Sequence, residues 1–220
     1  WEVIVTGGDP FLLSPSRVAA IVRRLDAIPH VAVMRFHTRV PVVDPGRLRP
    51  ALVAALATDK ALYVVIHANH PRELTAPVRD AVGRLTRAGI PVLSQTVLLR
   101  GVNDDPAVLE SLLRGLVAMR VKPYYLHHPD LAPGTARFRL GIARGQDLVR
   151  ALRGRASGLC QPSYVLDIPG GYGKVPIARG AATAAGPAAP GEEPARWAVE
   201  DASGTRHLYP PPGAGDPADC

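Results

Sequence analysis

The 220-residue sequence contains only two cysteines, Cys160 and Cys220. Two thiols make neither a disulfide framework nor a recognisable metal knuckle, which excludes a thiolate-bound cluster held by this chain alone. The sequence also lacks any apolar run close to the roughly 18 residues that span a bilayer, and no signal peptide opens it. We therefore expect no membrane partner and a cytoplasmic location.

Lysine is scarce as well, since Lys60, Lys122 and Lys174 are the only lysines among 26 basic residues. Arginine keeps its proton in proteins, whereas a lysine amine can lose its proton and attack an aldehyde. Lys174 ends the glycine-rich stretch "DIPGGYGKVP", whose backbone can approach a ligand closely. If it is desolvated, Lys174 is a candidate nucleophile for an aldehyde such as pyridoxal phosphate; otherwise it is a solvated surface lysine.

The chain is basic, with a formal net charge of +7 and a pI near 9.9. Its arginines are spread along amphipathic segments such as "RVAAIVRRLDAI" rather than gathered in a block, so nucleic acid is not the expected partner. A hydrophobic content of 47% and a charged content of 20% are those of an ordinary globular protein. The length suits one domain with an appended tail.

Short apolar, β-branched runs alternate with helical patterns through the first 160 residues, which indicates repeated strand and helix units. The expected strands are residues 3–7, 31–36, 61–67, 91–99 and 122–128. The expected helices lie near residues 16–28, 47–58, 72–88, 106–120 and 144–154. This series predicts an α/β fold with a parallel sheet, either an open doubly wound sheet or an incomplete (β/α) barrel of the TIM type.

Unusual polar residues and glycines recur where the expected strands end, which is the edge at which parallel sheets carry their sites. They are Gly7, Gly8, Asp9, His37, Arg39, His67, Asn69, His70, Gln95, Arg100, His127, His128 and Asp130. The recurrence predicts a single site along that edge.

Two of these segments have a structural and a functional interpretation. "TGGDP" is either a turn, or a segment in which Gly7 and Gly8 bring the backbone close to a ligand while Asp9 accepts from an amine or hydroxyl. It is not a phosphate loop, because the Walker lysine is missing. "HANHP" carries two imidazoles three residues apart, but without a third strong ligand nearby it favours hydrogen bonding to a ligand over a metal site.

Asp130 and Asp167 each follow an apolar, strand-like run. Either one alone can cap a turn. If both face one cavity, their mutual repulsion requires a cation between them, and a substrate ammonium would serve.

Residues 179–220 are rich in alanine, glycine and proline, with one short candidate strand at "ARWAVEDA". Such a composition buries little apolar surface, so we expect a domain at 1–178 followed by a mostly disordered tail at 179–220. The sequence starts at Trp1 directly before a strand. We therefore also expect a chain that is the C-terminal part of a longer protein, with the first strands of its barrel missing.

Several long segments together resemble one known family. They are "VIVTGGDPFLLS", "IPHVAVMRFHTRVPVVDPGRL", "HANHPREL", "AGIPVLSQTVLLRGVNDD", "VKPYYLHHPDLAPGTARFR" and "LRGRASGLCQPSYVLDIPGGYGKVPI". In this order they are similar to lysine 2,3-aminomutase, a radical S-adenosylmethionine enzyme that also uses pyridoxal phosphate. The resemblance runs from residue 2 to about residue 177 without a large gap and is more specific than any single motif.

The resemblance implies roles for three residues of the second half of the chain. Lys174, in "GGYGK", matches the catalytic lysine that holds pyridoxal phosphate covalently. Asp130 and Asp167 match the two aspartates that bind the side-chain ammonium of the substrate lysine.

The resemblance also implies a site for S-adenosylmethionine in the first half of the chain. Its residues are Gly7, Gly8, Asp9, His67 and Gln95. The first three match the segment at the amino group of that cofactor, and the other two match contacts near its ribose.

The activity implied is the interconversion of L-lysine and β-lysine through a 5'-deoxyadenosyl radical and lysine joined to pyridoxal phosphate. A [4Fe-4S] cluster, reduced by a donor such as flavodoxin or ferredoxin, generates that radical. The family's three-cysteine cluster motif is absent here, so the chain alone is expected to be inactive. Cys160 is expected to be packed, and Cys220 alone cannot rebuild the intersubunit zinc site of some members, which leaves a homo-oligomer open.

Other functions remain open from the sequence. One is an aminomutase acting on glutamate or on a lysine of a translation factor, although two aspartates favour free lysine because they would repel a substrate carboxylate. Another is a cluster-free remnant that binds pyridoxal phosphate or no cofactor. A basic nucleic-acid-binding domain is the third.

Overall fold

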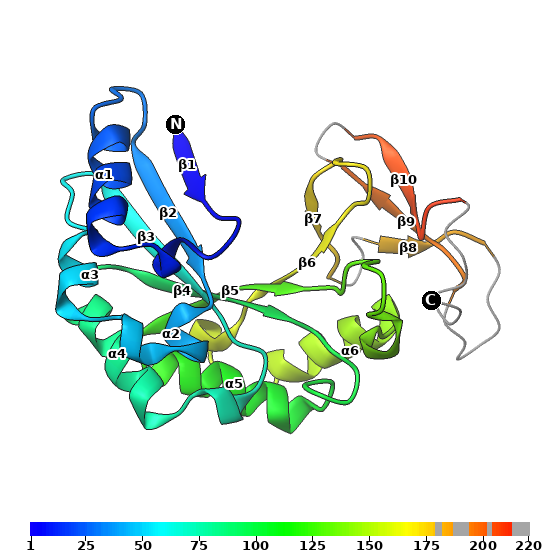
Figure 1. The fold of residues 1–220 in the computed structure, drawn as a ribbon. Helices are drawn as coiled ribbons and strands as arrows, with labels where there is room; N and C mark the ends of the chain where they lie inside the picture. The colour runs from blue at the N-terminus through cyan, green and yellow to red at the C-terminus, as the bar shows by residue number, and fades with distance from the viewer. Residues whose placement is uncertain (179–181, 187–193, 202–203, 213–220) are drawn as a thin grey trace. The chain divides into compact units, whose positions relative to one another are not determined.

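The computed structural model describes residues 1–178, 182–186, 194–201 and 204–212 (Figure 1). The chain divides into two compact units. The first unit contains residues 1–95 and 111–123, and the second contains residues 96–110 and 124–220.

Seven strands follow one another in a sheet in chain order. They are β1 (Glu2–Val5), β2 (Val33–Thr38), β3 (Ala61–His67), β4 (Val92–Val97), β5 (Val121–His127), β6 (Ser163–Asp167) and β7 (Lys174–Pro176). The pairs β1–β2, β2–β3, β3–β4 and β5–β6 are parallel, and β6–β7 is antiparallel. A doubly wound sheet would reverse its strand order at a switch point, whereas a barrel adds strands in sequence. The prediction of an α/β fold of the incomplete-barrel type is confirmed.

Helices connect these strands. They are α1 (Pro15–Asp26), α2 (Val40–Val43), α3 (Pro50–Ala54), α4 (Ala76–Arg87), α5 (Pro106–Ala118) and α6 (Ile142–Arg153). As the sequence suggests, α1 begins with a cap, because the Ser14 hydroxyl accepts from the N–H of Arg17 at 3.4 Å and proline takes the first helical position. None of the helices in the described part of the chain is long and apolar enough to cross a membrane.

The core of the first unit forms where α4 covers the sheet (Figure 1). On α4 the buried side chains recur at helical spacing, at Val78, Ala81, Val82 and Leu85. On β3 three consecutive residues are buried, Val64, Val65 and Ile66. Consecutive burial is typical of a parallel strand covered on both faces, and it fixes the strand ends that carry the polar residues.

Some expected elements differ from the structure. The helix expected at 47–58 is only Pro50–Ala54, preceded by a 3-10 turn at Pro45–Arg47. Prolines have no N–H to donate and therefore start short helical segments here instead of continuing one. Strands β6 and β7 and the short helix α2 were not among the expected elements.

The described residues beyond 178 form a second, antiparallel sheet in the second unit, in the order β10-β9-β8. Its strands are β8 (Ala182–Ala184), β9 (Trp197–Glu200) and β10 (Arg206–Tyr209), and β9 lies in the expected segment "ARWAVEDA". Trp197, Val199 and Tyr209 are buried, so this sheet buries more apolar surface than the Ala-, Gly- and Pro-rich composition predicts. The rest of the expected disordered tail, at 179–181, 187–193, 202–203 and 213–220 with Cys220, lies outside the described residues.

Candidate functional site

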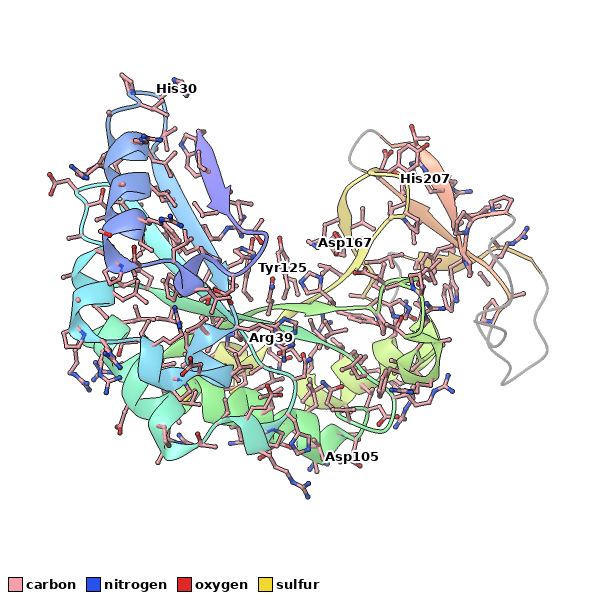
Figure 2. The ribbon with its side chains drawn as sticks, viewed as in Figure 1. His30, Arg39, Asp105, Tyr125, Asp167 and His207 are labelled. Carbon is pink, nitrogen blue, oxygen red and sulfur yellow. The ribbon has the colours of Figure 1, made fainter. Side chains whose placement is uncertain are left out.

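The first unit has a cavity of about 380 Å³ at the carboxyl ends of β1, β2 and β3. Its lining includes all five residues predicted for S-adenosylmethionine, Gly7, Gly8, Asp9, His67 and Gln95. Arg39, labelled in Figure 2, is another lining residue. The structure therefore brings these five residues together around one cavity.

The backbone at Gly7 and Gly8 needs glycine. Their φ angles are +80° and +42°, which side chains rarely adopt, and both residues are exposed on the cavity. A Cβ at either position would meet no atom within 4 Å, so the requirement comes from conformation and not from crowding. Their backbone is thus accessible to a ligand.

The carboxylate of Asp9 is engaged by four donors of the chain itself. Oδ1 accepts from the N–H of Phe11 at 3.0 Å and from the hydroxyl of Thr38 at 2.6 Å. Oδ2 accepts from the N–H groups of Arg39 and Val40. These bonds fasten the end of β1 to the end of β2, so the turn interpretation holds for this side chain.

His67 and Gln95 lie side by side at matching positions of β3 and β4. His67 Nε2 lies 3.0 Å from Oδ1 of Asn69. The second imidazole of "HANHP" has a structural contact, because Nδ1 of His70 accepts from the N–H of Arg72 at 3.1 Å and caps a 3-10 turn. In the described ranges, no three histidine, cysteine, aspartate or glutamate residues are grouped to hold a metal.

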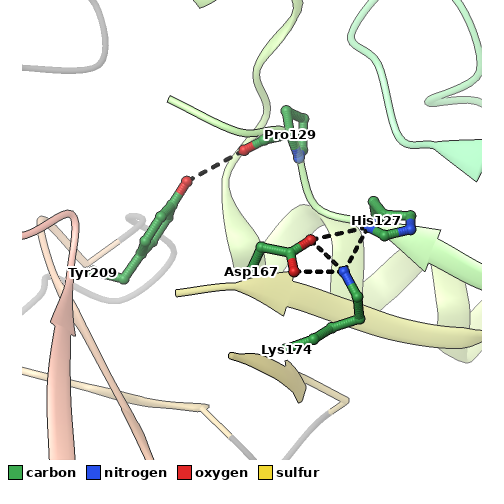
Figure 3. A network of polar contacts seen from close by, with 5 residues as sticks. All are labelled: His127, Pro129, Asp167, Lys174 and Tyr209. Atoms are coloured by element: carbon green, nitrogen blue, oxygen red, sulfur yellow. Dashed lines mark hydrogen bonds and ion pairs between the residues drawn. The ribbon is translucent and has the colours of Figure 1, made fainter. Parts of the chain in front are cut away.

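In the second unit, Lys174 faces Asp167 across the β6–β7 hairpin (Figure 3). The Lys174 ammonium donates to both carboxylate oxygens of Asp167. Nδ1 of His127, at the end of β5, lies 3.2 Å from Asp167 Oδ2 and 3.3 Å from Lys174 Nζ. The Tyr125 ring lies 5.5 Å from Nζ, within the range of a cation–π contact. The structure therefore brings Lys174, Asp167 and His127 together at the ends of neighbouring strands.

The surroundings of His127 favour its neutral form. Burial, followed by the positive charge of Lys174, lowers its pKa below 6.5, and the Asp167 carboxylate opposes this effect. A neutral ring at pH 7 has a single hydrogen, and which ring nitrogen carries it depends on whether Nδ1 donates to Asp167 or accepts from Lys174.

Asp130 is exposed and follows Pro129 just beyond β5. Its negative charge slightly opposes the lowering of the pKa of His127. Its backbone carbonyl accepts from Nε of Arg139 at 3.2 Å. The Asp130 carboxylate thus influences the Lys174 group electrostatically, through His127.

A buried layer that sequence reasoning missed supports this group. Nδ1 of His128 lies 2.8 Å from the hydroxyl of Tyr164, and burial lowers the pKa of His128 to about 4. The Tyr209 hydroxyl donates to the carbonyl of Pro129 at 3.4 Å (Figure 3), and its ring stands edge-on to His128 at 5.6 Å. The pair "HH" after an apolar strand was the only sequence signal, and it does not distinguish a packed histidine from a functional one. Cys160 is buried, as expected.

Comparison with known proteins agrees with the resemblance seen in the sequence. No protein-family model matches the chain. It is 45% identical over 177 residues to a putative L-lysine 2,3-aminomutase of Aquifex aeolicus, covering 80% of this chain and 48% of that protein. It is 42% identical over 176 residues to the L-lysine 2,3-aminomutase of Clostridium subterminale, covering 80% and 42%. The glutamate 2,3-aminomutase of Clostridioides difficile is 36% identical over 80% of this chain and 42% of its own length.

The chain thus spans about half the length of the curated relatives that it matches. The resemblance to lysine 2,3-aminomutases is confirmed over four fifths of the chain.

Solved structures are similar in fold. A domain of pyruvate-formate lyase-activating enzyme from Bacteroides vulgatus has a TM-score of 0.51 and 16% identity, covering 74% of this chain and 97% of that chain. Streptococcus suis SuiB bound to S-adenosylmethionine has a TM-score of 0.53 and 10% identity, covering 75% and 39%. At these identities the likeness concerns the fold alone.

Proposed function

We propose that this chain carries the pyridoxal phosphate and substrate residues of a radical S-adenosylmethionine aminomutase that interconverts L-lysine and β-lysine. The observation that carries the proposal is the contact of Lys174 with Asp167 and His127, in a chain 36 to 45% identical to aminomutases. Lys174 is a scarce residue type placed at a hairpin end, where its amine meets a carboxylate and a neutral imidazole.

Lys174 and Asp167 would change partners in two steps. Lys174 must lose a proton and leave Asp167 before its amine can act as a nucleophile. Once Lys174 has left, the Asp167 carboxylate is free to bind another ammonium. The side chain of substrate lysine has the same chemistry as that of Lys174, so Lys174 occupies in the free chain the position that we assign to the substrate ammonium.

The residues present fit pyridoxal phosphate, because the linkage requires a lysine amine, and Lys174 offers one at the end of a glycine-rich hairpin loop. When bound, this group supplies a conjugated system through which nitrogen can migrate. Lys174 would hold it, and Asp130 and Asp167 would orient the far end of the substrate. Two carboxylates select an ammonium over a carboxylate, which favours lysine over glutamate.

The cavity of the first unit fits S-adenosylmethionine by its exposed glycine backbone and by His67 and Gln95. Since four donors of the chain engage Asp9, we assign ligand contacts to the backbone of Gly7 and Gly8 and a positioning role to the Asp9 side chain. Together with a [4Fe-4S] cluster, this cofactor supplies the hydrogen-abstracting radical and requires an external electron donor. The two cysteines of this sequence do not suffice for such a cluster.

Trapping the covalent linkage tests the proposal. The chain is incubated with pyridoxal phosphate, reduced with borohydride and digested, and the labelled lysine is identified by mass spectrometry. We expect the label on Lys174 and its loss in Lys174→Ala. Lys122→Ala is the matched control, because Lys122 is an exposed lysine on β5 and its removal should leave labelling unchanged. Equal labelling of all three lysines would contradict the proposal.

Binding measurements test the choice of substrate. L-lysine should bind in competition with the Lys174 ammonium, as measured by calorimetry. Asp130→Asn and Asp167→Asn should each weaken this binding. Glutamate should bind poorly to the wild type and to both variants. Preference for glutamate would favour the specificity of the glutamate 2,3-aminomutase relative.

A further inference from the structure

The loop that delivers Lys174 has little intrinsic rigidity. It joins β6 to β7, and Gly170, Gly171 and Gly173 have φ angles between +84° and +97°. A hydrogen bond from the N–H of Ile168 to the carbonyl of Gly173, at 2.9 Å, closes its base. Glycines lose the most conformational freedom on folding, so a contact at the tip of this loop decides how well it is held.

Tyr172 makes that contact. It is the residue with a side chain among the loop glycines, and its ring lies 4.1 Å from the ring of His207, tilted by 35°. His207 lies on β10, outside the strands of the barrel-type sheet (Figure 2). Aromatic pairs at this separation attract beyond their buried area.

His207 is itself fixed in position. Its Nε2 lies 2.7 Å from Oδ2 of Asp201, and these side chains are only 13% and 11% exposed. Asp201 Oδ1 accepts from the N–H of Thr205 at 3.0 Å, and a bond from the N–H of Gly204 to the Asp201 carbonyl closes the same turn. Asp201 therefore orients the imidazole that contacts Tyr172.

Two residues further along β10, Tyr209 contacts the other substrate segment. Its hydroxyl donates to the carbonyl of Pro129, adjacent to Asp130, and burial raises the pKa of Tyr209 to about 12, so the hydroxyl keeps its hydrogen. Residues two apart on a strand share a face, whereas Leu208 between them is 39% exposed. One face of β10 thus contacts both the loop of Lys174 and the carbonyl of Pro129, which precedes Asp130.

We propose that β10 is a positioning strap for the site, in which His207 orients the Lys174 loop through Tyr172 and Tyr209 orients Asp130 through Pro129. The functional meaning of the two segments rests on the proposed function, but the mechanical coupling does not. These positioning roles fall on residues beyond 178, where the composition predicts a mostly disordered tail.

Hydrogen exchange tests the coupling without any cofactor. In His207→Ala, we expect amide exchange in residues 168–174 to rise about two- to tenfold, the range of an aromatic pair, with no change near Asp130. His207→Phe keeps the ring and should restore slow exchange. Tyr209→Phe should accelerate exchange at Asp130 and Leu131 and leave the loop unchanged. Leu208→Ala, on the other face of the same strand, is the matched control and should alter neither segment.

The same variants are then compared for borohydride-trapped pyridoxal phosphate. His207→Ala and Tyr172→Ala should each slow labelling of Lys174 about two- to tenfold, and the double variant should be no slower than either single one, because both remove one contact. Unchanged loop exchange in His207→Ala, with His207→Phe also unchanged, would overturn the strap. A wild-type chain that shows the exchange pattern but takes up no pyridoxal phosphate would instead overturn the proposed function and leave the strap in place.

Discussion

The two units use a carboxylate at a strand end in opposite ways. In the first unit Asp9 is bonded to three backbone N–H groups and a threonine hydroxyl. In the second unit Asp167, whose side chain is 43% exposed, pairs with the side chain of Lys174. A carboxylate held by backbone donors can change partner only if the turn opens, whereas one held by a side chain can exchange it. The first arrangement shapes a cavity, and the second suits a reaction in which cations replace one another.

The second unit also has a buried group of neutral side chains next to the Lys174–Asp167 pair. His128, Tyr164 and Tyr209 are all buried, and they contact one another through a hydrogen bond and an edge-on ring pair. The unit therefore separates an exchangeable ion pair from a rigid neutral support. In the first unit a charged carboxylate, Asp9, holds the strand ends together. In the second unit the supporting side chains are buried and neutral.

Acid should disrupt the neutral support. Burial lowers the pKa of His128 from 6.5 to about 4, so the folded chain binds this proton less tightly than the unfolded chain does. The associated stability is fully present above pH 6.5 and is lost as the pH falls toward 4, by about 3 kcal/mol in total. Urea unfolding of wild type and His128→Asn at pH 7.5 and 4.5 measures it. The variant should lose less stability on acidification, and equal losses would contradict the neutral support.

Removing the charge of the first unit should also destabilise it. Asp9→Ala leaves several chain donors without an acceptor, and we expect a loss of about 2 kcal/mol in the free energy of unfolding. Asp9→Asn keeps one carbonyl oxygen for the donors at Oδ1 and should lose less. If Asp9→Ala unfolds at the same urea concentration as wild type, the carboxylate does not fasten β1 to β2.

Much of the fold could be predicted from the sequence, because its strands and helices carry strong periodicity. The consecutive apolar residues of β3 and the spaced ones of α4 identify their elements directly. Strands β7 and β8 have only three residues each, which is too short for a period to appear. Burial of Trp197 and Tyr209 depends on contacts with distant segments, which composition does not reveal.

The sequence predicted which residues line the cavity of the first unit, but not which groups Asp9 and Lys174 contact. Strand ends grouped the cavity residues correctly, since the carboxyl ends of parallel strands meet at one edge. The sequence did not reveal that Asp9 would be engaged by its own chain, because three of its four donors are 29 to 31 residues away. Nor did it reveal that Lys174 would pair with Asp167, since that contact depends on the register of a hairpin.

A substitution of the strand-end carboxylate in the second unit sharpens the comparison between the two units. Asp167→Asn removes the charge from a partly exposed ion pair, and such pairs contribute less than about 1 kcal/mol. We therefore expect a smaller change in the free energy of unfolding than for Asp9→Ala, measured under identical conditions. A loss as large as that of Asp9→Ala would show that the Asp167 carboxylate is structural too, and the exchange of cations at this position would then be excluded.

The smallest expected effect is electrostatic and concerns His127. The charge of Lys174 lowers the pKa of His127, and the charge of Asp167 raises it. Lys174→Ala should therefore raise the pKa of this ring toward 6.5, and Asp167→Asn should lower it further, as followed by NMR titration of the imidazole signals. Because burial is the largest influence and remains in both variants, neither should restore an ordinary pKa fully. Opposite directions for the two variants are what a shared ion pair next to one imidazole requires, and shifts in the same direction would mean that His127 responds to a change of local structure instead of to these two charges.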